Sequence, residues 1–353
     1  MSSFCSFLVF RPDEFELVRS LCADASWSVR GITDPSKRYR FFGSGWAEVS
    51  KASALPESSD LRDDEEFGQV LVFETEQDEA DNAIELIRAA NLILEGFPDQ
   101  FSPSGHGFAI PDDPTEREEI YEQIFRKTGY FEKFTFRQTL PVAVAVAAKA
   151  WSDSRLVYAV HKLALSLVTE SVTPHSMHPR HKQVFEKHSG NFSSHVGTSV
   201  AINLAYSAIQ ELGLDVRASG KNRRWSDNED FVWNQDVLEG LKTRLKDSGI
   251  DPDRTIDWVV RGEKSEVEVH PIRDSLTAQS DGGVVRDLEL SLPDAINRCE
   301  HLRNFMTAHA FSRSTPLLGP YEVYNTQQVA RFLMLSKCGL WNVWTEELRV
   351  RYS

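Results

Sequence analysis

Apolar residues recur at helical spacing over most of the chain beyond its first third. Between Glu79 and Leu94 they return every three or four positions, and the pattern stops at Gly96 ahead of Pro98, which is typical of a helix and its end. The same periodicity predicts helices over Thr115 to Lys127, Leu140 to Trp151, Ser154 to Glu170, Ser194 to Leu212, Gln235 to Asp247, Ser291 to Arg313 and Thr326 to Ser336. Short β-branched and aromatic runs predict strands over Phe7 to Phe10, Arg40 to Val49 and Gln69 to Phe73.

These elements divide the chain into two expected domains. A stretch with several proline and glycine residues between Pro103 and Pro114 is typical of a linker. We therefore expect a mixed α+β domain over residues 1–134 and an all-α helical bundle over residues 135–353. Gly213 and Gly249, which each follow a predicted helix, are candidate C-caps.

Composition is that of an ordinary folded protein, and the charge is strongly negative. The chain has 353 residues, of which 41% are hydrophobic and 26% charged, and its formal net charge is −14. Most of the acidic excess lies between Glu57 and Glu85. Because non-specific nucleic-acid binding depends on clustered Lys and Arg, any RNA contact must be local.

The cysteines and the apolar runs bear on location. Cys5, Cys22, Cys299 and Cys338 show no paired spacing, which indicates free thiols in a reducing compartment. The longest apolar stretch, Leu140 to Ala148, is far shorter than the roughly 20 residues of a membrane span. We expect a cytoplasmic protein without membrane contact.

The predicted helix over Ser291 to Arg313 contains an arginine, an amide and a histidine close together: Arg303, Asn304 and His309. Arginine stays charged and matches phosphate with a planar fork, whereas histidine can accept or donate a proton near neutral pH. On an ideal helix Arg303 and His309 lie about 60° to either side of the apolar line through Met306. Polar groups beside a buried seam need a partner, which a two-fold pairing of this helix with a second copy would supply.

This motif resembles the R-(N/D/H)-x(4–6)-H signature of the HEPN superfamily. Further stretches similar to prokaryotic proteins with a HEPN-like helix are Ala205 to Leu214, Trp233 to Leu245 and Trp258 to Glu263, so the resemblance covers about Ser194 to Arg313. Five residues separate Arg303 from His309, where four is frequent in the family. The N-terminal third resembles no family.

The resemblance implies a helical bundle that forms a homodimer through the helix carrying Arg303 and His309. It also implies a metal-independent endoribonuclease without a cofactor, acting in bacterial antiviral defence or a toxin–antitoxin system. His309 would act as general base or acid, Arg303 would stabilise phosphoryl charge, and Asn304 would orient the histidine or hold a phosphate oxygen. An inhibitory or sensor protein partner and a sensing N-terminal domain fit that setting.

The alternative is a non-catalytic module that binds RNA, a nucleotide or a partner protein. In that case Arg303 pairs with Glu300 one turn earlier and His309 lies in the core. Cleavage of RNA in the presence of a chelator distinguishes the two hypotheses.

Two other segments contain candidate binding residues. Basic and aromatic side chains that could grip an RNA backbone and stack a base occur together at Arg217, Lys221, Arg223, Arg224 and Trp225, although such a run is also typical of a solvated loop. Histidines are densest at His175, His178, His181, His188 and His195. Zinc is the alternative interpretation of this cluster. No metal is expected, because metal sites usually combine histidines with a carboxylate or thiolate in fixed geometry, and Pro174 and Pro179 make a regular helix unlikely here.

Overall fold

A computed structural model describes most of the helical part of this chain and part of the remainder. The described residues are 3–10, 12–25, 28–33, 39–42, 45–48, 66–67, 69–76, 80–96, 108–116, 119, 130–132, 139–170, 192–219, 221, 223–226, 232–261, 285–307 and 320–345. Helix predominates among them.

The chain forms two compact units. Unit 1 comprises residues 1–94, 99–154 and 343–353, and unit 2 comprises residues 95–98 and 155–342. The division near residue 154 differs from the boundary expected near residue 135. The helix over residues 139–150 belongs to unit 1, because its side chains are almost all buried and it packs on another helix of that unit.

The strands of unit 1 form two antiparallel sheets. The first has the order β2-β6-β1-β7, with bounds Ser28–Thr33, Gln69–Glu76, Ser3–Phe10 and Phe108–Ile110. The second has the order β5-β3-β4-β8, with bounds Glu66–Phe67, Tyr39–Phe42, Gly45–Glu48 and Tyr130–Glu132. The single strand predicted over Arg40 to Val49 is wrong, because Phe42 pairs with Gly45 and the segment forms a hairpin.

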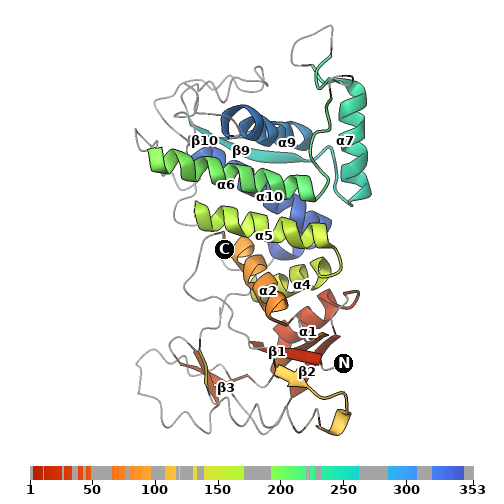
Figure 1. The fold of residues 1–353 in the computed structure, drawn as a ribbon, viewed down its shortest axis with the longest axis vertical. Helices are drawn as coiled ribbons and strands as arrows, with labels where there is room; N and C mark the ends of the chain where they lie inside the picture. The colour runs from red at the N-terminus through yellow and green to blue at the C-terminus, as the bar shows by residue number, and fades with distance from the viewer. Residues whose placement is uncertain are drawn as a thin grey trace. The chain divides into compact units, whose positions relative to one another are not determined.

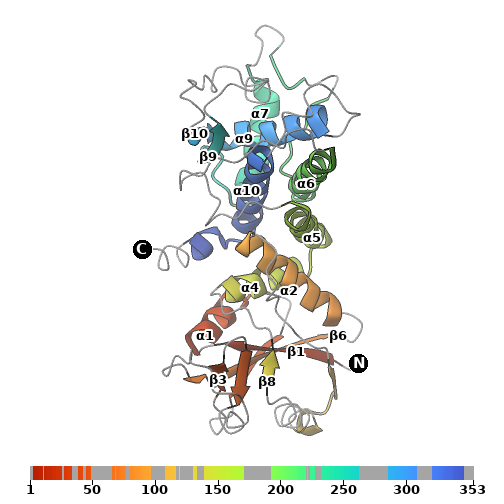
Figure 2. The same cartoon turned by 90° about the vertical axis from the view of Figure 1, so that its left-hand side faces the viewer.

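Unit 1 also contains three long helices, one of which packs on the first sheet. They are α1 (Pro12–Leu21), α2 (Ala80–Glu95) and α4 (Thr139–Ala150). α1 contacts α4 as well as β1 and β6 (Figures 1 and 2). Thr139 Oγ1 donates to Asn91 Oδ1 at 3.4 Å, which joins α4 to α2. The predictions for α2 and α4 are confirmed to within one residue at each end, whereas α1 was not predicted. The helix predicted over Thr115 to Lys127 lies mostly outside the described residues.

Helices α5 (Ser154–Thr169), α6 (Phe192–Glu211) and α10 (Pro320–Lys337) form the centre of unit 2. α5 and α6 run antiparallel, since Lys162 contacts Ser207 whereas Ser166, further along α5, contacts Ala201. α10 packs along α6 (Figure 1). Gln327 on α10 donates to both Ser166 Oγ and the Glu170 carbonyl, so a satisfied buried amide joins the helices.

Helix ends in unit 2 follow local sequence rules. Gly213 adopts a φ of 74°, and the Leu214 amide donates back to the Ile209 carbonyl, which confirms the predicted glycine C-cap of α6. α7 spans Gln235–Asp247, as predicted, and Asn234 caps its first turn through the Asp236 amide.

Unit 2 is mainly helical but not all-α as expected. β9 (Thr255–Arg261) and β10 (Val285–Ser291) pair in an antiparallel two-stranded sheet with Trp258 opposite Leu288. β10 leads directly into α9 (Leu292–His301), which contacts both strands (Figure 1). The β-branched and alternating residues of these strands favour pairing. Because β10 leads directly into α9, this two-stranded sheet fixes where the motif-bearing helix begins.

Candidate functional site

Ser291 starts the helix that leads to the Arg/His motif. Its hydroxyl oxygen accepts from the Asp294 amide at 3.2 Å and its hydroxyl donates to Asp294 Oδ2 at 2.6 Å, so the first turn is capped. After His301 the helix widens into a π-helical segment, Leu302–Thr307. Arg303 and Asn304 lie in this segment. π-Helical turns are rare and often mark functional sites.

Arg303, Asn304, Glu300 and Arg224 form one hydrogen-bonded chain, here called the arginine–glutamate cluster. Arg303 Nη1 donates to Asn304 Oδ1 at 2.6 Å, and Asn304 Nδ2 donates to Glu300 Oε1 at 3.1 Å. The same oxygen forms an ion pair with Arg224 Nη2 at 2.6 Å. The Glu300 carboxylate thus holds the Asn304 amide, and the Asn304 side-chain oxygen in turn orients Arg303.

Glu300 is the buried centre of this cluster. Its side chain is 10% exposed and that of Arg224 is 13% exposed. Burial raises the pKa of the Glu300 carboxyl above its ordinary value, and this outweighs the opposing effect of Arg224. The phenol of buried Tyr206 on α6 has a raised pKa as well, first through burial and then through the charge of Glu300. A buried carboxyl with a perturbed pKa and a specific charged partner is characteristic of functional sites.

The apolar line of α9 is covered within the same chain. Leu292, Cys299 and Leu302 are at most 1% exposed, and α6 and α10 pack against this helix. Burial raises the pKa of the Cys299 thiol to about 12. The seam therefore has its apolar partners without a second copy of the helix. Because the helix is π-helical over Leu302–Thr307, the ideal α-helical projection does not apply to Arg303 and Asn304. His309 lies outside the described residues.

The predicted RNA-contact segment is divided between several surroundings. Arg224 belongs to the arginine–glutamate cluster and is correspondingly buried. The Trp225 ring lies against Trp233 with centroids 5.3 Å apart, and Trp233 Nε1 donates to Asp294 Oδ1 at 2.8 Å. Lys221 and Arg223 are exposed. The segment thus contacts the end of α9 directly through Arg224 and its start only indirectly, through Trp233.

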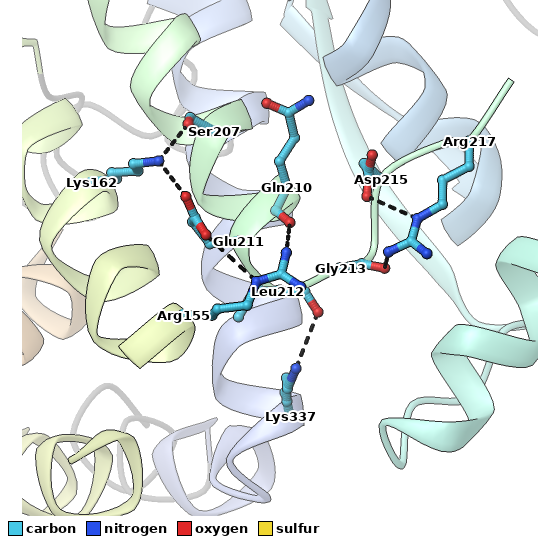
Figure 3. Close-up of polar contacts among 10 residues, drawn as sticks. All are labelled: Arg155, Lys162, Ser207, Gln210, Glu211, Leu212, Gly213, Asp215, Arg217 and Lys337. Atoms are coloured by element: carbon cyan, nitrogen blue, oxygen red, sulfur yellow. Dashed lines mark hydrogen bonds and ion pairs between the residues drawn. The ribbon is translucent and has the colours of Figure 1, made fainter. Parts of the chain in front are cut away.

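Arg217, from the same predicted set, lies instead at the carboxyl end of α6, where several cations gather (Figure 3). Arg155 Nη2 donates to the Gln210 carbonyl at 2.8 Å and Lys337 Nζ to the Leu212 carbonyl at 3.1 Å. Arg244 donates to the carbonyls of Gly213 and Asp215 at 3.2 and 2.8 Å. These cations donate hydrogen bonds to carbonyls that have no partner within the helix at its C-terminal end. Their positive charge is also favourable beside the negative end of the helix dipole. These contacts stabilise the fold.

The α5 to α6 contact in Figure 3 has the same structural character. Lys162 Nζ lies 2.6 Å from Glu211 Oε1 and 2.9 Å from Ser207 Oγ. The pKa of Glu211 is lowered, chiefly by its hydrogen bond from Lys162.

Neither the predicted histidine cluster nor the apolar character of the helices adds residues to the candidate site. His175, His178, His181 and His188 lie outside the described residues, and His195 is buried on α6. Within the described ranges, His, Cys, Asp and Glu form no group of three or more that could hold a metal ion. No helix in the described part of the chain has the length and apolar character needed to span a bilayer.

Sequence reasoning named Glu300 only as an ion-pair partner of Arg303, whereas in the structure Glu300 pairs with Arg224 and Arg303 donates to Asn304. It did not identify Tyr206 as a site residue. Glu300 precedes Asn304 by four residues, a spacing that places two side chains on one helix face, and that signal was available. The contact with Arg224 joins distant parts of the chain and has no local signature. Comparisons with protein-family models, curated proteins and solved structures found no match for this chain.

Proposed function

We propose that the chain is a metal-independent endoribonuclease of HEPN type. The observation that carries the proposal is the arginine–glutamate cluster, in which Arg303 and Asn304 of the motif join the buried Arg224–Glu300 pair on a π-helical segment. Such a cluster holds a guanidinium in a defined direction. Preorganised cations of this kind stabilise charge that develops on phosphoryl oxygens.

The proposed reaction is an internal transesterification of RNA. The ribose 2′-oxygen forms a bond to the adjacent phosphorus, and the bond from phosphorus to the 5′-oxygen of the next nucleotide breaks. One proton leaves the 2′-hydroxyl and another reaches the departing 5′-oxygen, with His309 serving one of these transfers. Arg303 stabilises the phosphoryl charge and Asn304 holds Arg303. The products are a 2′,3′-cyclic phosphate and a 5′-hydroxyl, and DNA is inert because it lacks the nucleophile.

The wider proposal includes a homodimer and a defence or toxin–antitoxin role in the cytoplasm. The helix carrying Arg303 and His309 would contact its copy in a second subunit. The contact would use a surface other than the apolar line, which other helices of the same chain cover. An N-terminal α+β domain would sense or regulate, and a neighbouring protein would hold the activity in check. These elements rest on the resemblance of the motif.

A non-catalytic binding module is the second candidate. The observation that favours it is the 2.6 Å contact between Arg303 Nη1 and Asn304 Oδ1, which engages both motif side chains within the chain. In such a module the cluster is a structural link between α9 and the Arg224 segment.

Cleavage of labelled single-stranded RNA by the purified full chain in excess chelator tests the proposal. Wild type should cut, and Arg303→Ala and His309→Ala should each lose at least about a hundredfold in rate, the size of a general acid–base contribution. Asn304→Ala should lose less. Arg155→Ala is the matched control and should retain activity, because this exposed arginine at the start of α5 contacts the end of α6. RNA with a single 2′-deoxy substitution at the cut site should resist.

Mixing the two inactive variants tests the dimer. If one cleft takes Arg303 from one subunit and His309 from the other, heterodimers of Arg303→Ala and His309→Ala contain one intact site and recover activity. Recovery fails if each site uses a single subunit. Metal-dependent cleavage, or cleavage unaffected by both substitutions, refutes the enzyme and leaves the binding module.

A further inference from the structure

Helices α5 and α6 carry a cluster of exposed apolar side chains, here called the α5–α6 face. Within the described part of the chain, five of the six exposed large apolar side chains lie on these two helices. They are between 42% and 63% exposed: Tyr158, Leu165, Val168, Val196 and Val200. Single exposed apolar residues are normal on a folded protein, whereas a cluster of them marks an interaction site.

The five side chains lie on one side of the helix pair. Ser166 Oγ on α5 donates to the Ala201 carbonyl on α6 at 2.7 Å, which brings Val168 nearly level with Val200. On each helix the exposed residues are turned about 90° from the side that contacts the other helix, in the same rotational sense. Because α5 and α6 run antiparallel, two turns of the same sense point to the same side. The two helices therefore share one apolar face.

This face has a charged end and an uncharged end. Residues 165–169 of α5 and 196–206 of α6 include no Asp, Glu, Lys or Arg. The cations toward the start of α5, Arg155 and Lys162, both pair with Glu211. At neutral pH the face thus offers no excess positive charge to an acidic protein or a nucleic acid, and no excess negative charge to a basic partner.

A second copy of the chain fits this charge pattern. The formal net charge is −14, so two copies repel each other unless the surfaces that touch carry no net negative charge. A two-fold axis near Val168 and Val200 places the uncharged ends of both copies at the centre. Arg155 then lies roughly 20 Å from the axis, beyond the Debye length of about 8 Å. An apolar centre with a polar rim is the usual anatomy of a protein interface.

We propose that the α5–α6 face is a contact between two copies of this chain. The two helix pairs pack across a two-fold axis near Val168 and Val200 and form a four-helix arrangement, so each copy covers the exposed side chains of the other. This contact does not depend on the proposed function. The dimer of that proposal uses the helix that carries Arg303 and His309, whereas this one uses α5 and α6.

Sedimentation equilibrium of the full chain tests the contact. Wild type should form a dimer whose population rises with protein concentration. Leu165→Glu and Val200→Glu should each weaken the dimer at least about tenfold, because each buries a carboxylate at the centre of the interface. Both positions are exposed in the single chain, so both variants should fold, which circular dichroism checks. Val232→Glu is the matched control, because Val232 is also exposed but lies outside the face, and its dimer should be unchanged.

Cross-linking tests the position of the axis. A residue near a two-fold axis meets its own copy, so a short bismaleimide should join Val168→Cys into covalent dimers. Tyr158→Cys, roughly 15 Å along α5 from Val168, should not cross-link. The described native cysteines Cys22, Cys299 and Cys338 are buried, and wild type serves as the control for all native thiols. Cross-linking of Tyr158→Cys but not of Val168→Cys contradicts this arrangement.

The possible results separate this contact from the proposed function. A wild type that stays monomeric, or a dimer that both glutamate substitutions leave unchanged, overturns the inference. Arg303→Ala should keep the dimer. Association that Leu165→Glu abolishes, in a protein that cuts no RNA, retains the contact and refutes the nuclease. RNA cleavage by a protein whose dimer ignores both glutamate substitutions does the reverse.

Discussion

Arg224 Nη2 lies 2.6 Å from Glu300 Oε1, and both side chains are nearly buried. This ion pair joins two parts of the chain. One is the basic segment predicted to contact RNA, and the other is the helix predicted to carry the catalytic residues. Arg224 is therefore paired with a carboxylate of the protein itself. Through this pair the basic segment contacts the motif-bearing helix inside the fold. Three predictions concern the stability of unit 2 and one concerns its pH dependence.

Arg224→Met should destabilise the protein by about 3 kcal/mol, because it leaves the Glu300 carboxylate buried without its cation. Adding Glu300→Gln should restore most of that loss, since the double variant buries no unpaired charge. Urea denaturation of wild type, both single variants and the double variant gives the coupling energy. Additive single effects would show that the pair is not coupled.

Glu300 should make wild-type stability fall as the pH rises. Burial raises the pKa of Glu300 in the folded state above its unfolded value, so its favourable contribution is complete below the unfolded pKa and is lost as the pH rises through the folded pKa. Glu300→Gln lacks this titration. The free energy of unfolding of wild type minus that of the variant should therefore decrease as the pH rises above the ordinary pKa of a glutamate, about 4.3. A difference that stays constant or increases contradicts the assignment.

Arg244→Met should cost about 2 kcal/mol, because Arg244 donates to three carbonyls between Gly213 and Gly240 and hydrogen bonds from charged donors contribute more than neutral ones. Arg217→Met is the control. That side chain is 56% exposed and its ion pair with Asp215 spans 3.7 Å, so its effect should be near zero. Equal losses for both variants in urea denaturation would mean that the end of α6 does not depend on Arg244.

Gly213→Ala and Gly240→Ala should change the melting temperature in opposite directions. Gly213 has a φ of 74°, where a Cβ costs about 1 kcal/mol. Gly240 lies inside α7, and an added Cβ would meet only Arg244 Nη1 at 3.6 Å, so alanine should gain about 0.5–1 kcal/mol of helix stability. Calorimetry of both variants checks the pair. A stabilising Gly213→Ala would contradict the αL cap.

Local signals predicted most of the helices, but they missed α1 and placed the start of α10 at Thr326, where the helix begins at Pro320. The bounds of α7 follow from its apolar spacing, the Asn234 cap and the glycine at 249, and α5 and α6 were placed within two residues at each end. These features depend on neighbouring residues, which the sequence displays directly.

Features that depend on distant residues were not predicted. β9 and β10 pair across a long stretch of chain, and Glu300 meets Arg224 from another segment. The residues within a strand do not say which other strand it pairs with, and the contact between Glu300 and Arg224 has no local sequence pattern. The sequence thus predicted that Arg303 and Asn304 belong together, whereas the hydrogen bond from Asn304 to Glu300 and the ion pair of Glu300 with Arg224 required the fold.

The π-helical segment from Leu302 to Thr307 also affects how spacing in this motif should be compared among proteins. A turn of this kind absorbs one more residue than an ordinary helical turn. A chain with one residue fewer at this point would continue as regular α-helix and present the following side chains in nearly the same direction. Two sequences with different numbers of residues between the arginine and the histidine of the motif can therefore share one geometry. Deleting a single residue within Leu302–Thr307 would accordingly change the helix only slightly.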